Sequence, residues 1–224
     1  MDFTKFVSML ENSALYFCRS DLLGDPFEGS FSKANDMMRP PVYKDIPEEK
    51  RSKFFGQQAD FNKWQRQWTF ISCWHMNHYE SAAMWKLYAK TNEAVAVRSS
   101  FSRLCELVDE STHVGCVEYI DFESQWLPEG NAFYPFVHKR LSFAHENELR
   151  AVIQKFPIVN SRIDSSAIPP LGITRSIDIS KLFSKIYIAT TSPEWFKVLV
   201  ENICCKYSLK VPIVQSSLDA DPIF

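Results

Sequence analysis

The stretch Trp68–Val97, WTFISCWHMNHYESAAMWKLYAKTNEAVAV, has the pattern of a strand, a polar loop, a short helix and a second strand. It opens with TFISCW (Thr69–Trp74), a β-branched and aromatic run that predicts a strand. After a polar segment, Ser81 provides an N-cap for a short aromatic helix, AAMWKLYA. TNE ends that helix, and AVAVRS predicts the second strand. The polar residues between these elements form a rim, and rims of this kind carry function more often than cores do.

The same reasoning extends in both directions along the chain. Apolar residues at helical spacing predict helices at 3–11 and 101–110, a helical turn at 136–141 and a helix with Ser192 as N-cap and Pro193 as its first residue. Residues 30–68, polar with an apolar stripe, predict a helical insertion over the strand core, which could also be a mobile lid. Further strands are predicted at 14–20, 114–122, 145–153, 185–190 and 210–216, and residues 168–179 predict a turn followed by another strand. We therefore expect an α+β fold with a mixed, mainly antiparallel sheet and helices packed around it.

Composition limits the class of protein. The chain has 224 residues, 46% of them hydrophobic, and a formal net charge of −2. One domain spanning 1–224 is expected at this length. The near-neutral charge gives no electrostatic reason to expect a nucleic-acid or membrane surface, and no apolar run is long enough to span a membrane. The six cysteines lack a C-x-x-C framework, which is typical of reduced thiols, and predict a soluble cytoplasmic protein.

The segment GDPFEG (24–29) is a turn at the end of the first strand. Asp25 and Glu28 could hold this turn by accepting hydrogen bonds from nearby backbone N–H groups. They could instead lie at the mouth of a pocket where the strand ends.

The segment HENELRAVI (145–153) carries the most suggestive charges. On a strand, Glu146 and Glu148 project to one side with Cα atoms roughly 7 Å apart, and Arg150 lies on that side as well. Two carboxylates this close raise the pKa of one of them unless cations or water screen the pair. The segment could be an exposed Glu–Arg ladder, or a carboxylate pair in which one group stabilises a sugar-like cation and the other serves an acceptor.

Three other constellations compete with this pair. His75 and His78 could bind zinc from a helix or tight turn, but no second pair with metal spacing follows. Cys73 and His75 would share a strand face, as a cysteine nucleophile and its base do, although no orienting Asn or Asp accompanies them. A divalent-metal nuclease site would use four carboxylates but has an arginine in place of the usual lysine; these carboxylates are Asp25, Glu28, Glu146 and Glu148.

Three segments, LYFCRSDLLGDPFEG, FISCW…AAMWKLYAKTNEAVAV and HENELRAVI, in this order, resemble the bacterial domain-of-unknown-function 2971 family. The resemblance covers most of residues 14–153. The chain departs from the family pattern at Gly24, where the family has Asn, and at Glu93-Ala94, where it usually has Gly. The matching residues are Asp25, Pro26, Phe27, Glu28, Ser72, Cys73, Trp74, Met84, Trp85, Tyr88, Ala89, Glu146, Glu148 and Arg150.

A second, weaker resemblance suggests a chemistry. Arg19 at a strand end, Ser72 on a later strand and Glu-x-Glu on a third look like the Arg…Ser…Glu pattern of ADP-ribosyltransferases. The resemblance implies that NAD is the substrate, that Arg19 and Ser72 hold it, and that Glu148 bonds the ribose hydroxyl while Glu146 faces the acceptor.

Trp74, Trp85 or Tyr88 could stack on the nicotinamide ring. The resemblance further implies a bacterial toxin or phage-defence effector whose acceptor is a protein or nucleic acid. The first expectation is therefore an ADP-ribosyltransferase or NAD glycohydrolase. The alternative is a non-enzymatic nucleotide- or protein-binding module, in which these motifs define the fold, and a metal-dependent nuclease is the third.

Overall fold

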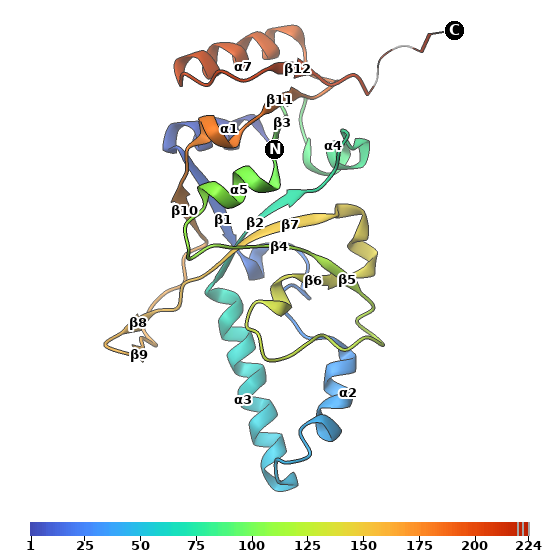
Figure 1. The fold of residues 1–224 in the computed structure, drawn as a ribbon, viewed down its shortest axis with the longest axis vertical. Coiled ribbons are helices and arrows are strands. Elements are labelled where there is room, and N and C mark those ends of the chain that lie inside the picture. The colour runs from blue at the N-terminus through green and yellow to red at the C-terminus, as the bar shows by residue number, and fades with distance from the viewer. Residues whose placement is uncertain (219, 221, 224) are drawn as a thin grey trace. The chain divides into compact units, whose positions relative to one another are not determined.

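The computed structural model describes residues 1–218, 220 and 222–223 (Figure 1). These residues group into two compact units that interleave along the chain. Unit 1 comprises Met1–Tyr16, Asn77–Asp109 and the chain from Thr174 onward, and unit 2 comprises Phe17–Met76 and Glu110–Ile173. The expectation of a single domain stays a prediction, and each unit is described by itself.

Unit 1 is built on a three-stranded sheet with strand order β12-β11-β3. Strand β11 (Lys185–Ile188) pairs antiparallel with β3 (Val95–Arg98) and parallel with β12 (Ile213–Gln215). The parallel pair is connected through α7 (Glu194–Lys206), as a parallel connection requires. The unit's other helices are α1 (Phe3–Asn12), α4 (Ala82–Tyr88), α5 (Phe101–Leu107) and α6 (Ile179–Leu182).

The core of unit 1 lies on one face of this sheet. Ile186 and Ile188 of β11 and Val95 of β3 are fully buried, as is Phe196 of α7. Phe196 also makes an edge-to-face contact with Phe3 of α1, with ring centroids 5.2 Å apart. The α1, α4 and α5 helices appear where the apolar spacing predicted them, and Ser81 accepts a hydrogen bond from the Met84 N–H as the N-cap of α4.

Unit 2 is organised around a five-stranded sheet with strand order β10-β1-β2-β7-β4. Its central strands are β2 (Thr69–His75) and β7 (Glu148–Gln154), which pair antiparallel over their whole length. The remaining strands of this sheet are β1 (Ala14–Arg19), β4 (His113–Cys116) and β10 (Gly172–Ser176), of which residues 14–16 of β1 and 174–176 of β10 fall within the bounds of unit 1. Two further strand pairs belong to unit 2: β5 (Glu118–Ile120) with β6 (His138–Arg140), and β8 (Ile158–Val159) with β9 (Arg162–Ile163). The mainly antiparallel sheets with helices confirm the predicted α+β class.

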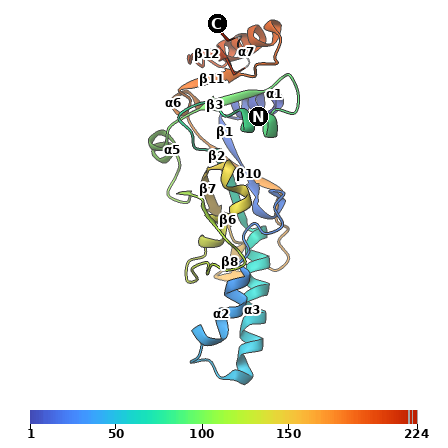
Figure 2. The ribbon, with the colours of Figure 1, turned by 90° about the vertical axis from the view of Figure 1, so that its right-hand side faces the viewer.

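The predicted helical insertion is present as α2 (Lys33–Val42) and α3 (Glu48–Gln67), two helices that are joined by a short connection at the bottom of Figure 1 and are seen from the side in Figure 2. The buried carboxylate of Glu129 fixes this hairpin to the loop after β5. It accepts hydrogen bonds from the Asn35 amide at 3.0 Å, from Arg39 Nε at 2.8 Å and from the Tyr43 hydroxyl. These buried contacts favour a fixed element over a mobile lid.

Several local predictions are wrong in detail. The strand predicted at 114–122 is two strands, β4 and β5, and the helical turn predicted at 136–141 is mostly the strand β6. A short 3₁₀ helix, η2 (Tyr134–Phe136), precedes β6, and another, η3 (Leu141–Glu146), follows it. Pro193, not Ser192, is the N-cap of α7. A third short 3₁₀ helix, η1 (Ser20–Leu22), follows β1.

No helix among the described residues is both long and apolar enough to cross a bilayer. No group of three or more His, Cys, Asp or Glu side chains among them is arranged to hold a metal ion.

Candidate functional site

The charged residues of the Glu-x-Glu-x-Arg segment form a buried ion network in unit 2. At its centre the Arg150 side chain is 1% exposed. Its guanidinium donates to both carboxylate oxygens of Glu28, at 2.5 and 2.9 Å, and to both of Glu148, at 2.8 and 3.3 Å. A further bond, of 2.7 Å, goes to the Phe136 carbonyl. Because a guanidinium has five N–H donors, every donor of Arg150 is used.

The network continues from Glu148 toward the surface through Lys139 of β6. Lys139 Nζ donates to Glu148 Oε1 at 2.8 Å and also to the Glu146 carboxylate. Glu148 thus has an arginine on both oxygens and a lysine on one of them. We define the ion network as Glu28, Lys139, Glu146, Glu148 and Arg150.

The two glutamates of the network hold protons with different affinity. Burial opposes ionisation of Glu148, but a hydrogen bond from Glu146 and the charge of Arg150 outweigh it, so the pKa of Glu148 lies well below its usual value. Burial and the neighbouring Glu148 raise the pKa of Glu146, although Lys139 opposes this. The pair therefore carries one fixed negative charge on Glu148, and Glu146 is the member that takes up a proton first.

The geometry of the pair differs from the predicted one. Glu146 is not on the strand: it ends η3, and Asn147 follows with a left-handed backbone at φ 40°. The predicted polar edge of the strand is also wrong, since Glu148 and Arg150 are as buried as the apolar residues of β7. The two glutamates nevertheless converge, because both bind Lys139.

The GDPFEG turn contributes both of its acidic residues to buried ion pairs. Asp25 accepts the Phe27 N–H at 3.0 Å, as predicted for a residue that holds its own turn. It also accepts a 2.7 Å bond from Arg140, whose guanidinium lies 4.3 Å from the Phe27 ring centroid. For Glu28, the expected local role is wrong: its carboxylate binds Arg150, 122 residues away in the sequence.

The register of the sheet separates the residues that the NAD-binding expectation grouped together. Side chains directly opposite each other in an antiparallel pair point to the same face. Ser72 pairs with Ala151, whereas Glu148 pairs with His75, so Ser72 and Glu148 lie on opposite faces. Arg19 pairs with Phe70 and shares the face of Ser72. The structure therefore does not bring Arg19 and Ser72 together with Glu148.

The Arg19 side chain is bound to groups within the protein. Its Nε donates to Asp21 at 2.6 Å and its Nη1 to the Pro169 carbonyl at 3.0 Å. Trp74 shares the sheet face of Ser72 by register and is half-buried, and its indole N–H has no hydrogen-bond partner among the described residues. This face accordingly carries Arg19, Ser72 and Trp74 without a carboxylate of the ion network.

The two remaining candidate residues belong to unit 1. Trp85 and Tyr88 lie on α4, where the Trp85 indole donates to Glu80 at 3.1 Å. The Tyr88 side chain is exposed. The ring of Trp85 is thus bound to Glu80, which lies in the loop before the helix.

The alternative constellations find little support. Cys73 is exposed by surface area, but the protein atoms that surround its thiol raise its pKa against the opposing charge of Arg150, which disfavours the thiolate that a nucleophile needs. His75 Nδ1 is hydrogen-bonded to the Glu146 carbonyl at 2.6 Å. For a metal nuclease, Lys139 provides the lysine that the sequence motif lacks, but its Nζ is bonded to both glutamates.

Two members of this region, Lys139 and Tyr119, were not predicted from the sequence. The Tyr119 hydroxyl accepts the Glu148 backbone N–H at 2.8 Å, and burial raises its pKa. Neither residue belongs to a motif. A lysine flanked by His138 and Arg140 is typical of a solvated surface, so no local pattern indicated that Lys139 would be buried.

Unit 1 contains an open pocket of about 400 Å³. It is lined by residues at the ends of α1 and α7 and around α6, none of which was a candidate. The carboxylate of Asp178, its acidic lining residue, is occupied as the N-cap of α6. The pocket therefore offers no free charged group for a ligand.

No family model, no curated protein and no solved structure matches this chain in the three comparisons. Both resemblances noted in the sequence stay predictions.

Proposed function

We propose that this chain is a non-enzymatic binding module, in which the Glu-x-Glu-x-Arg segment stabilises unit 2 and does not catalyse a reaction. One observation carries this proposal: all five N–H donors of Arg150 are used inside the protein, and both oxygens of Glu148 are held by cations. A carboxylate that must bind a substrate hydroxyl needs access to the substrate, and Glu148 is only 5% exposed.

Buried charges of this kind are typical of a structural network. Glu28 and Arg150 come from distant segments, and their bidentate pair fixes the GDPFEG turn against β7. Glu148 and Lys139 likewise join β7 to β6. The network thus links the GDPFEG turn, β6 and β7 through buried ion pairs.

ADP-ribosyl transfer or NAD hydrolysis is the second candidate, favoured by the opposite pKa shifts of Glu146 and Glu148. A proton-carrying group beside a fixed anion is the arrangement that glycosidic chemistry uses. In this function Glu146 would exchange the proton and Glu148 would remain ionised. Arg19 and Ser72 would then not contribute from the same face of the sheet.

Incubation with NAD tests the two candidates. Nicotinamide release would be measured by chromatography for the wild type and for Glu148→Gln, with Glu123→Gln as a control that removes an exposed carboxylate of a surface ion pair. The binding module predicts no release above the uncatalysed background for any of the three. Release by the wild type and Glu123→Gln, lost in a folded Glu148→Gln variant, would establish the enzyme and overturn our proposal.

A further inference from the structure

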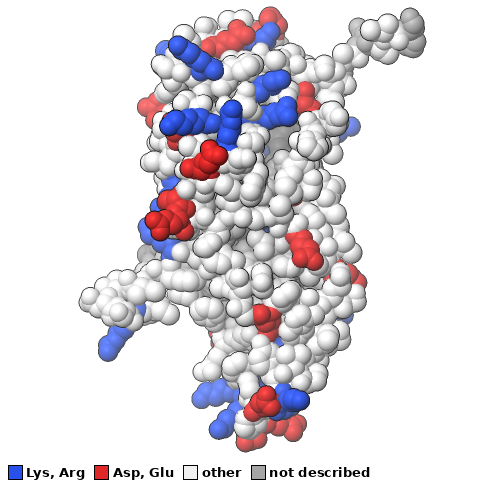
Figure 3. All heavy atoms as spheres, in the orientation of Figure 1, with Lys and Arg blue, Asp and Glu red and all other residues white. Residues whose placement is uncertain are grey.

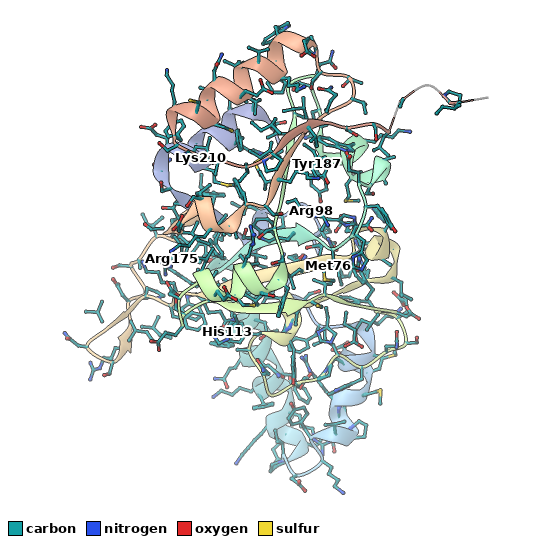
Figure 4. The ribbon with its side chains drawn as sticks, turned by 45° about the horizontal axis from the view of Figure 1, so that its top comes forward. Met76, Arg98, His113, Arg175, Tyr187 and Lys210 are labelled. Carbon is teal, nitrogen blue, oxygen red and sulfur yellow. The ribbon has the colours of Figure 1, made fainter. Side chains whose placement is uncertain are left out.

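The three-stranded sheet of unit 1 has a cationic face opposite its core. The register of β3 and β11 places Lys185 directly opposite Arg98 and Tyr187 directly opposite Ala96. Because side chains alternate along a strand, these four lie on the face opposite to the buried Ile186 and Ile188. We call Arg98, Lys185 and Tyr187 the cationic triad. Figure 4 labels Arg98 and Tyr187 on these neighbouring strands.

The two cations of the triad have no acidic partner among the described residues. Arg98 is exposed, and its side chain makes no hydrogen bond or ion pair with any residue that the structure describes. Its backbone carbonyl accepts the N–H and the hydroxyl of Ser184. Lys185 Nζ lies 5.5 Å from the centroid of the Tyr187 ring. Figure 3 shows Lys and Arg side chains gathered over the part of the surface where this sheet lies.

Like charges directly opposite each other destabilise an antiparallel pair. Lys181 of unit 1, by contrast, lies 3.4 Å from Asp178. A pair of neighbouring cations without an acidic partner is the arrangement that an anion with two negative charges would neutralise. A guanidinium offers a phosphate two parallel hydrogen bonds, and an ammonium adds a second charge.

Resting on the binding module proposed above, we infer that the cationic triad binds a nucleoside phosphate. Arg98 and Lys185 hold the phosphate, and the aromatic ring of Tyr187 contacts the base. The ring is half-buried and sits beside the cations, and aromatic rings stack on bases of every type. The sheet thus supplies both chemical parts of the recognition from adjacent strands.

Calorimetric titration of the full chain with ADP, AMP and adenosine tests this inference. We expect ADP to bind more tightly than AMP, adenosine to bind at least 10-fold more weakly than ADP, and added salt to weaken ADP binding. Arg98→Gln and Lys185→Gln should each weaken ADP at least 10-fold. Lys181→Gln, which removes the same charge from a paired lysine of unit 1, should leave it unchanged.

Thermal unfolding separates binding from folding. Without nucleotide, Arg98→Gln should melt no lower than the wild type, since it removes a like-charge contact. With ADP, the wild type and Lys181→Gln should melt higher, and Arg98→Gln should not respond.

The inference is overturned if ADP does not bind, if it binds equally to Arg98→Gln and wild type, or if only a single-stranded oligonucleotide binds. None of these outcomes changes the result of the nicotinamide-release experiment, so the nucleotide-binding inference and the proposed function can be refuted independently.

Discussion

Replacing Arg150 by methionine tests the role of the ion network most directly. The substitution keeps much of the side-chain volume but removes all five hydrogen bonds of the guanidinium. Glu148 keeps Lys139, whereas Glu28 loses the one cation that binds its carboxylate among the described residues. A carboxylate that is 2% exposed would then be left buried and unpaired.

The expected loss follows from this imbalance. Removing one partner of a buried ion pair costs about 3–5 kcal/mol in the free energy of unfolding, mostly because the other charge stays desolvated. Removing both charges avoids that penalty, so Glu28→Leu with Arg150→Met should be about 1–3 kcal/mol more stable than the two single losses predict together. Lys33→Met, which breaks the exposed surface pair with Glu123, is the matched control and should cost much less, because water screens that pair.

Urea titrations followed by far-UV circular dichroism measure these free energies by linear extrapolation. The reasoning is refuted if Arg150→Met costs no more than Lys33→Met. It is equally refuted if the double variant loses the full sum of the two single losses, because the buried charges would then be independent.

Three further predictions concern other parts of unit 2. The pKa of Glu148 is lower in the folded than in the unfolded chain, so the unfolded chain takes up the proton more readily. The free energy of unfolding should therefore fall as the pH drops below about 4. Urea titrations at several pH values would measure this dependence, and Glu148→Gln should flatten it. Glu129→Gln removes the charge that binds α2, so the amides of α2 should exchange faster with deuterium while those of β7 are unchanged. Gly29 has φ +68°, and a Cβ there would lie 2.4 Å from a ring carbon of Phe136. Gly29→Ala should therefore lower the free energy of unfolding by about 1–3 kcal/mol more than Gly24→Ala, which is also at positive φ but meets open space.

The elements of Trp68–Val97 could be predicted because their signals are local. The strand β2, the helix α4 with its Ser81 cap and the strand β3 each follow from residues within a few positions of one another. The same holds for the helical insertion. Where a prediction was wrong locally, as for Glu146, a single backbone conformation was responsible: Asn147 is left-handed and ends a 3₁₀ helix before the strand begins.

The partners of the charged residues could not be predicted. Glu28 and Arg150 are 122 residues apart, and Lys139 reaches Glu148 from a segment whose composition is typical of a surface. Sequence spacing fixes which side of a strand a residue faces, but it does not fix which segment covers that side. The register between β2 and β7 is also a tertiary property, and it alone separates Ser72 from Glu148.

The ion network and the cationic triad differ in whether their charged groups already have partners within the protein. In the ion network every donor of Arg150 has an acceptor, so a ligand that approached it would have to displace bonds already made within the protein. At Arg98 and Lys185 the charges are held opposite each other without an acceptor among the described residues, and a ligand would relieve their repulsion. A motif such as Glu-x-Glu-x-Arg does not distinguish these situations, because its letters are the same whether its carboxylates are satisfied or free. Unsatisfied charge fixed on a rigid sheet is therefore the stronger physical argument for a binding site, even where no motif marks it.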